Sequence, residues 1–216
     1  KWDVPVVANI AGETIEEYSR MASMLEGGEG ISAIEVNISC PNISSSGVLF
    51  GQSPDMAASL TKAVRNETSL PVIVKLTPNV TDITAIARAV ADAGADAISL
   101  INTIFGMAID IKRRLPALGN LTGGLSGPAV KPVALYMVWK AYQAVSIPVI
   151  GIGGISSAAD ALEFIMAGAT AIQVGTANFF NPNATIEVID GIELFMEGEG
   201  IENISELIGA AQPQRH

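Results

Sequence analysis

The amino-acid sequence predicts an α/β fold and, within that class, a TIM (β/α)8 barrel. Six short, almost continuously apolar runs alternate with helix-patterned stretches, which is typical of parallel strands that helices cover. The same helix-to-strand turn occurs twice, as Ala-Gly-Ala-Asp-Ala at 93–97 and Ala-Gly-Ala-Thr-Ala at 167–171. This repetition favours a barrel over a doubly wound sheet. The absence of Gly-x-Gly-x-x-Gly after the first run weakens a dinucleotide-binding interpretation.

The expected strands are rich in Val and Ile and end at Gly or polar residues. Their order with the helices, β-α-β-α throughout, predicts right-handed crossovers between parallel strands. The predicted strands are Pro5–Ile10, Ala33–Ser39, Pro71–Thr77, Ala97–Asn102, Pro148–Gly153 and Ala171–Gly175.

The expected helices carry recognisable end signals. Ser53 followed by Pro54 indicates an N-cap with proline in the first turn, and Gly94 indicates a helix C-terminus. The predicted helices are Glu13–Leu25, Asp55–Arg65, Asp82–Ala93, Ala129–Val145, Ser157–Ala167 and Thr185–Met196.

A complete barrel has eight strands, whereas the sequence shows six. We therefore expect 1–216 to be a single barrel domain with about six of the eight βα units, two N-terminal units being absent. An open barrel of this kind would have two unpaired edges. On this expectation the chain alone is not a competent enzyme. Either a companion polypeptide supplies the remaining units, or the barrel is open and its strand edges are capped in some other way.

Composition narrows the function further. The net charge of −10 argues against non-specific nucleic-acid binding and against a polybasic membrane anchor. Cys40 is the only cysteine and His216 the only histidine, so an internal disulfide is impossible and His-based catalysis or a His-rich metal site is nearly excluded. An acidic, cysteine-poor chain is expected to be cytoplasmic.

The predicted strands end in polar residues or glycines, and in a barrel these ends converge on one face. Glycines that follow the last two strands expose backbone N–H groups near helix N-termini, which predicts a phosphate site. Lys75 ends an otherwise apolar strand, where its ammonium would need an anion such as a reduced flavin. The strand-end residues are Asn9, Asn37, Lys75, Asn102, Thr103, Gly153, Gly154, Gly175 and Thr176.

Two segments are longer than a connection between elements needs. Pro41–Ser53 is rich in Ser and Gly, and we expect it to act as a mobile lid. Thr103–Pro128 contains Lys112-Arg113-Arg114, which is either a solvated charge run or part of a subunit contact. Cys40 lies at the start of the first loop; a free cysteine is usually a buried apolar residue, but this polar context favours a chemical role.

Several motifs together resemble class 1 dihydroorotate dehydrogenases, in detail the NAD-linked class 1B type. The resemblance runs from the first residue nearly to the last. The motifs are Asn-Ile-Ser-Cys-Pro-Asn (37–42), Val-Lys-Leu-Thr-Pro-Asn-Val-Thr-Asp-Ile (74–83), Asn-Thr-Ile-Phe-Gly-Met-Ala-Ile-Asp (102–110), Gly-Gly-Leu-Ser-Gly-Pro-Ala-Val-Lys-Pro (123–132), Ile-Gly-Ile-Gly-Gly-Ile (150–155) and Gln-Val-Gly-Thr-Ala (173–177).

The resemblance implies oxidation of dihydroorotate to orotate in pyrimidine biosynthesis. Cys40 would be the base that removes the C5 proton, while hydride passes from C6 to N5 of FMN. Asn37, Asn102 and Thr103 would bind the substrate. A first substrate-binding lysine and a flavin-contacting segment would precede residue 1. The residues implied to hold FMN are Asn9, Asn37, Lys75, Ile101, Gly127, Gly153, Gly154, Gly175 and Thr176.

The NAD-linked type also implies partners: a homodimer, and a heterotetramer with an iron–sulfur flavoprotein subunit that carries FAD. One cysteine cannot ligate an iron–sulfur cluster, so FAD and the cluster are expected only in that subunit. Two alternatives stay open. The first is the flavin module of a dihydropyrimidine dehydrogenase, which turnover on dihydroorotate versus dihydrouracil would separate. The second is a non-catalytic barrel fragment, which would lack flavin absorbance.

Overall fold

The centre of the protein is a parallel β-sheet flanked by helices. The computed structural model describes residues 4–39 and 49–213. Within them the sheet has six strands in the order β1-β2-β3-β4-β9-β10, so neighbours in the sheet follow one another along the chain. The fold is therefore α/β with the topology of a barrel wall, as predicted. The strands are β1 Val6–Ile10, β2 Ile31–Asn37, β3 Val72–Lys75, β4 Ala97–Leu100, β9 Val149–Ile152 and β10 Ala171–Gln173.

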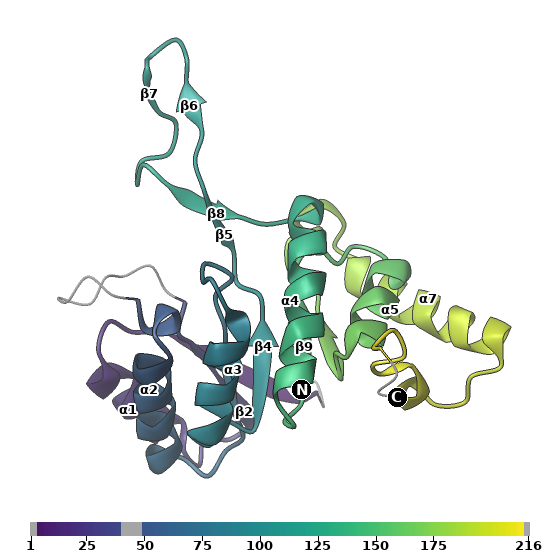
Figure 1. Ribbon diagram of the computed structural model, residues 1–216, viewed down its shortest axis with the longest axis horizontal. Helices are drawn as coiled ribbons and strands as arrows, with labels where there is room; N and C mark the ends of the chain where they lie inside the picture. Colours follow the sequence, from purple (N-terminus) through teal and green to yellow (C-terminus); the bar gives the residue numbers. More distant parts are fainter. Residues whose placement is uncertain (1–3, 40–48, 214–216) are drawn as a thin grey trace.

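The helices form a curved layer outside this sheet (Figure 1). Each main helix packs against the next one along the chain, from α1 through α5, and α5 packs against α7. This succession is what a barrel requires, since each helix covers the strand pair that it connects. The helices are α1 Ile15–Leu25, α2 Pro54–Glu67, α3 Ile83–Asp92, α4 Lys131–Ala144, α5 Ala158–Ala167, α6 Ala177–Phe180 and α7 Ala184–Glu199, with 3-10 turns η1 Phe50–Gln52, η2 Pro128–Val130 and η3 Ile204–Leu207.

The predicted helix-end signals are confirmed. Ser53 caps α2 by accepting a hydrogen bond from the backbone N–H of Met56, and Pro54 occupies the first turn. Gly94 follows α3 with φ of +100°, a backbone conformation that glycine adopts more easily than residues with a Cβ atom. Helix α4 is the exception, because Pro128–Val130 forms a 3-10 turn and the α-helix begins only at Lys131.

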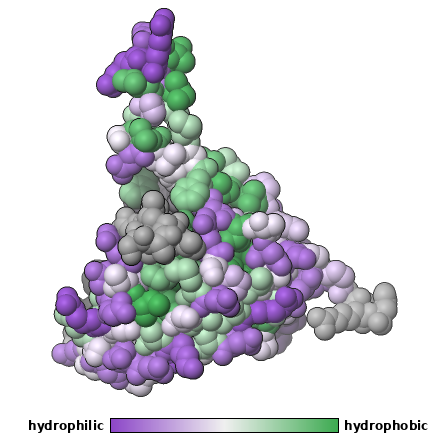
Figure 2. Space-filling model, turned by 60° about the vertical axis from the view of Figure 1, so that its left-hand side comes forward, coloured by the Kyte–Doolittle hydropathy of each residue, from purple (hydrophilic) through white to green (hydrophobic). Residues whose placement is uncertain are grey.

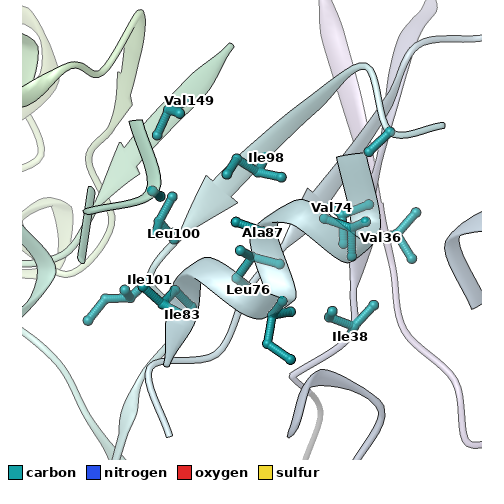
Figure 3. Packing of buried hydrophobic residues seen from close by; sticks show 14 of the residues in the cluster. Val36, Ile38, Val74, Leu76, Ile83, Ala87, Ile98, Leu100, Ile101 and Val149 are labelled. Carbon is teal, nitrogen blue, oxygen red and sulfur yellow. The ribbon is translucent and has the colours of Figure 1, made fainter. Parts of the chain in front are cut away.

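The central strands β2, β3 and β4 are largely buried on both faces, which explains why they read as apolar runs. On the helix side, Val36, Val74 and Ile98 of neighbouring strands pack with Ile83 and Ala87 of α3 (Figure 3). On the other face, a separate small cluster is formed by Ala33, Ile73, Ala97 and Ile150. That face is the barrel interior.

The register of the strands brings polar residues to one level of the interior. Asn9 lies opposite Glu35 in the β1–β2 pair. Lys75 lies opposite Asn37 on one side and opposite Ser99 on the other. All belong to the carboxyl halves of their strands, the end at which barrel active sites are built.

The strand bounds differ from the prediction mainly at the carboxyl ends. β2 begins at Ile31 and ends at Asn37, and β4 ends at Leu100. The polar residues that follow leave the sheet ladder and make side-chain contacts instead. β1 and β10 each have one strand neighbour among the described residues, and Val6 and Val7 on β1 are about half exposed.

The long segment before α4 is a two-tiered arm, residues 104–125, which was predicted only as a loop. β5 Ile104–Gly106 pairs antiparallel with β8 Gly123–Leu125, and β6 Ile109–Asp110 pairs with β7 Leu115–Pro116. Figure 1 shows the arm standing away from the sheet and helices. No helix in the described part of the chain is long and apolar enough to cross a membrane.

Candidate active site

A cavity of about 520 Å³ opens at the carboxyl ends of β3, β4, β9 and β10. Its size is in the range that binds cofactors and drug-sized ligands. Apolar side chains and glycines make up most of its wall, and Lys75 is its cationic residue. The wall comprises Lys75, Ile101, Asn102, Thr103, Leu125, Ser126, Gly127, Pro128, Val130, Ile152, Gly153, Gly154, Ile155, Ser156, Gly175, Thr176, Ala177, Phe180, Asn181 and Ala184.

Most of the residues predicted to bind a cofactor surround this one cavity, although they come from distant parts of the sequence. Asn9 and Asn37 do not line the cavity but lie beside it, at the ends of β1 and β2. Their roles remain predictions. The predicted cofactor residues in the wall are Lys75, Ile101, Gly127, Gly153, Gly154, Gly175 and Thr176.

The predicted phosphate-site glycines occupy positions where a side chain would interfere with the site. A Cβ at Gly154 would lie 2.8 Å from the carbonyl oxygen of Gly127 and 3.0 Å from the backbone nitrogen of Lys131. A Cβ at Gly175 would meet no protein atom within 4 Å. Gly154 therefore allows close packing against the start of α4, while Gly175 leaves free space where a ligand can approach the backbone.

A buried carboxylate, Glu35 on β2, lies below the cavity. Its Oε1 accepts hydrogen bonds from Ser99 Oγ at 2.7 Å and Gln173 Nε2 at 2.9 Å. Its Oε2 accepts from Asn9 Nδ2 at 2.6 Å and faces Lys75 Nζ at 3.5 Å. We call these five residues the Glu35 cluster; they come from five of the six strands.

The Glu35 cluster supplies the anion that the sequence analysis required for Lys75. Only 6% of the Glu35 side chain and 18% of the Lys75 side chain are exposed. Burial alone would raise the pKa of Glu35. Hydrogen bonds from Ser99, Gln173 and Asn9, together with the Lys75 ammonium, outweigh burial and lower the pKa below its usual value. Glu35 is therefore ionised at neutral pH.

Glu35, Ser99 and Gln173 were not among the predicted site residues. A signal for Glu35 was present, since it lies two residues before Asn37 on the same strand and therefore on the same face. The contacts of Ser99 and Gln173 with Glu35 carried no signal in the sequence, because each residue lies in a different strand from Glu35.

A second polar group joins the predicted substrate residues. Asn37 Oδ1 accepts hydrogen bonds from Ser39 Oγ at 2.6 Å and from Asn102 Nδ2 at 3.1 Å, and Asn102 Nδ2 also donates to Ser39 Oγ. Asn102 Oδ1 in turn accepts from the backbone N–H of Thr103 at 2.7 Å. The structure thus brings Asn37, Asn102 and Thr103 together beside the cavity, as their strand-end positions predicted.

Cys40 and residues 41–48 lie outside the described residues. The predicted base and most of the predicted lid, Pro41–Ser53, are therefore not placed, and both stay predictions. Among the residues that are described, no three His, Cys, Asp or Glu side chains gather in a way that could hold a metal ion.

The rim of the cavity is held by ion pairs at the starts of α4 and α5. Lys131 Nζ lies 2.7 Å from Asp160 Oδ1 and 3.0 Å from Glu163 Oε2. Asp160 Oδ2 accepts from the backbone N–H of Ser156. Burial works to raise the pKa of Asp160, but the Lys131 and serine hydrogen bonds prevail and lower it to about 2.

The chemistry of the cavity wall suits a flavin cofactor. Free space at Gly175, beside the turn at Gly153 and Gly154, suits a phosphate approaching backbone N–H groups. The apolar wall suits a flat aromatic ring system, and Lys75 offers a cation to its electron-accepting part. These are the residues that would hold the cofactor.

The chain has a parallel barrel-type sheet covered by helices, and its cavity lies at the carboxyl ends of the strands. This arrangement is that of TIM-barrel enzymes. A family described as dihydroorotate dehydrogenase matches residues 1–196. The chain belongs to the dihydroorotate dehydrogenase family, an oxidoreductase family, which confirms the resemblance found in the motifs.

Curated relatives share the family and also a subunit name. The dihydroorotate dehydrogenase B (NAD(+)) catalytic subunit of Desulforamulus reducens is 60% identical over 211 residues, covering 98% of this chain and 69% of that protein. The protein of the same name from Desulforudis audaxviator is 58% identical with the same coverage. That from Geotalea daltonii is 55% identical over 208 residues, covering 96% of this chain and 68% of that protein.

Proposed function

We propose that the chain is one FMN-binding barrel domain of an enzyme that oxidises dihydroorotate to orotate in pyrimidine biosynthesis. The observation that supports this most directly is that most of the predicted flavin residues surround a single cavity. The relatives' names support the choice of dihydroorotate over dihydrouracil. The chemistry that bound FMN supplies is acceptance of the hydride from C6 of the substrate.

The chain's own residues bind and orient both molecules. Gly153, Gly154, Gly175 and Thr176 would hold the phosphate through backbone N–H groups, and Lys75 would face the pyrimidine part of the ring system. Ile101 and Gly127 are in the cavity wall, where they would pack against the ring. Asn9 and Asn37 would complete the flavin contacts from the ends of β1 and β2.

The substrate side of the site is polar. Asn102 and Thr103 line the cavity, and Asn37 bonds to Asn102, so the three side chains can present amide and hydroxyl groups to the orotate ring and carboxylate. Cys40 would take the C5 proton, because its sequence position directly follows Ser39 of this polar group. Closure of Pro41–Ser53 would exclude water during the transfer.

The electrons would pass on to NAD through a partner subunit that carries FAD and an iron–sulfur cluster, in a heterotetramer built on a homodimer. The relatives' name, catalytic subunit, supports a partner. The arm supports a subunit contact, since its large apolar side chains are exposed. These are Phe105, Met107, Ile109, Ile111, Leu115, Leu118, Leu121 and Leu125.

The proposed flavin site is tested by replacing Gly175 with valine. A Cβ there meets no protein atom, so the free energy of unfolding should change by less than about 0.5 kcal/mol. Because the added side chain would occupy the space proposed for the phosphate, the dissociation constant of FMN should rise at least about tenfold. Flavin fluorescence titration and denaturant unfolding measure the two quantities.

Gly198→Val is the matched control. Gly198 lies near the end of α7, is exposed, and also has no atom within 4 Å of its Cβ position, yet it is not in the cavity wall. FMN affinity should stay at the wild-type value. Equal FMN affinity in the Gly175→Val, Gly198→Val and wild-type chains would refute the proposed phosphate site.

A further inference from the structure

A direct contact with a ligand in the cavity does not explain why the carboxylate of Glu35 is buried. Glu35 does not line the cavity, yet a carboxylate is expensive to bury, and this one receives four side-chain donors. A barrel interior at this level could be filled by apolar residues, as the neighbouring layer of Ala33, Ile73 and Ala97 shows.

Two of the four donors are residues proposed to contact FMN. Lys75 lies between Glu35 and the cavity, since it pairs with the first and lines the second. Asn9 donates to the same oxygen, Oε2. The other oxygen is held by Ser99 and Gln173, which fixes the orientation of the carboxylate.

We infer that Glu35 is a positioning residue that holds Lys75 in the cavity wall and Asn9 beside the cavity, and that offsets the charge of Lys75 there. This inference rests on the proposed flavin site. The carboxylate restrains the position of the ammonium and lowers the positive potential that a bound cofactor meets.

The charge balance has a direction that can be measured. A reduced flavin carries more negative charge around its pyrimidine ring than an oxidised one, so a lone ammonium would favour the reduced form. Glu35 weakens that preference. Removing its charge while keeping its shape, as in Glu35→Gln, should therefore strengthen binding of reduced FMN relative to oxidised FMN.

The experiment measures the dissociation constants of oxidised and reduced FMN for the wild-type chain, Glu35→Gln and Ser99→Ala. The ratio of oxidised to reduced constants should rise about tenfold in Glu35→Gln, the order expected for one unit charge inside a protein. Ser99→Ala is the matched control, because it removes one hydrogen bond to Glu35 and leaves the charges of Glu35 and Lys75 in place. A ratio in Glu35→Gln that moves no more than in Ser99→Ala overturns the inference.

A double-mutant cycle on the free energy of unfolding, without flavin, tests the Glu35–Lys75 pair separately. Glu35→Gln and Lys75→Met should each destabilise the chain, and the double variant should lose less than the sum, because no buried charge is left unpaired. Additive losses overturn the inference. If Glu35→Gln does not fold, we expect the double variant to fold, because it contains no unpaired buried charge. If neither variant folds while Ser99→Ala does, Glu35 is not needed to pair with Lys75, and the inference fails.

The two proposals fail in different ways. A wild-type chain that binds no FMN even in a protein with the complete barrel refutes the flavin site, while the cycle still decides whether Glu35 holds Lys75. A wild-type chain that binds FMN, combined with an unchanged ratio in Glu35→Gln, refutes only the role of Glu35.

Discussion

The Glu35 cluster and the arm invert the usual distribution of residues in opposite ways. In the cluster, a carboxylate and an ammonium lie inside the barrel, and four side-chain donors face the Glu35 carboxylate. In the arm, large apolar side chains face solvent, with Ile111 83% and Leu121 61% exposed. Figure 2 shows apolar and polar atoms mixed along the projecting arm.

The difference between the two regions indicates two kinds of functional feature in this fold: a buried polar group and an exposed apolar surface. A buried polar group and an exposed apolar surface are both costly unless something compensates them. The cluster is compensated within the chain, by hydrogen bonds and an ion pair. The arm has no comparable partner among the described residues, so its compensation is proposed to come from another subunit.

The largest expected effect concerns the polar residues in and around the cavity, in contrast to the apolar arm. Cys40→Ala should lower the rate of dihydroorotate oxidation by about 10²–10⁴-fold, the usual contribution of a general base. FMN binding should be unchanged, because Cys40 is not among the proposed flavin residues. Steady-state turnover and flavin absorbance measure these outcomes, and a loss of less than about tenfold would mean that another group takes the proton.

The apolar side is tested by Ile111→Glu in the arm. A charge placed in a subunit contact should weaken association by about tenfold or more, since buried apolar positions dominate such contacts. Sedimentation velocity over a range of concentrations, alone and with the proposed partner subunit, measures the association constants.

Met24→Glu is the control for the arm. Met24 on α1 is 74% exposed, comparable with Ile111, but it lies on the helical layer rather than the arm. Both variants should unfold with nearly the wild-type free energy. Association that weakens equally in the two variants, or in neither, would show that the arm is not the contact.

The smallest expected effect is the contribution of one ion pair at the cavity rim to the free energy of unfolding. Asp160→Asn removes one of the two acidic partners of Lys131 and should cost about 1 kcal/mol at neutral pH, after allowance for solvent screening. Because the folded-state pKa of Asp160 is lowered to about 2, this contribution is present above about pH 4 and is lost as pH falls toward 2. Unfolding curves of both proteins between pH 6 and 2 should converge; a constant difference would contradict the shift.

Much of the fold could be predicted because its signals are local. Ser53-Pro54 and Gly94 mark helix ends by their own conformational preferences, and both are confirmed. The glycines after β9 and β10 indicated the cavity wall for the same reason. The arm was predicted only as a long loop, since its strands are two or three residues long and carry no periodicity.

The candidate site was predictable in part. Strand-end residues such as Asn102 could be grouped because parallel strands end together. Glu35 could not be assigned partners, because Asn9, Lys75, Ser99 and Gln173 meet it only through the sheet register. Cys40 rests on sequence and family resemblance.

The hydrogen bonds of Glu35 also bear on the order of folding. Its partners lie 26, 40, 64 and 138 residues away along the chain, so the cluster is among the least local features of the molecule. Contacts across such separations require the closure of long loops, which slows their formation. We therefore expect the helices and adjacent strand pairs to assemble first, and the charged floor of the cavity to be completed only when β10 joins β9. Competence to bind a flavin would then arise at the end of folding.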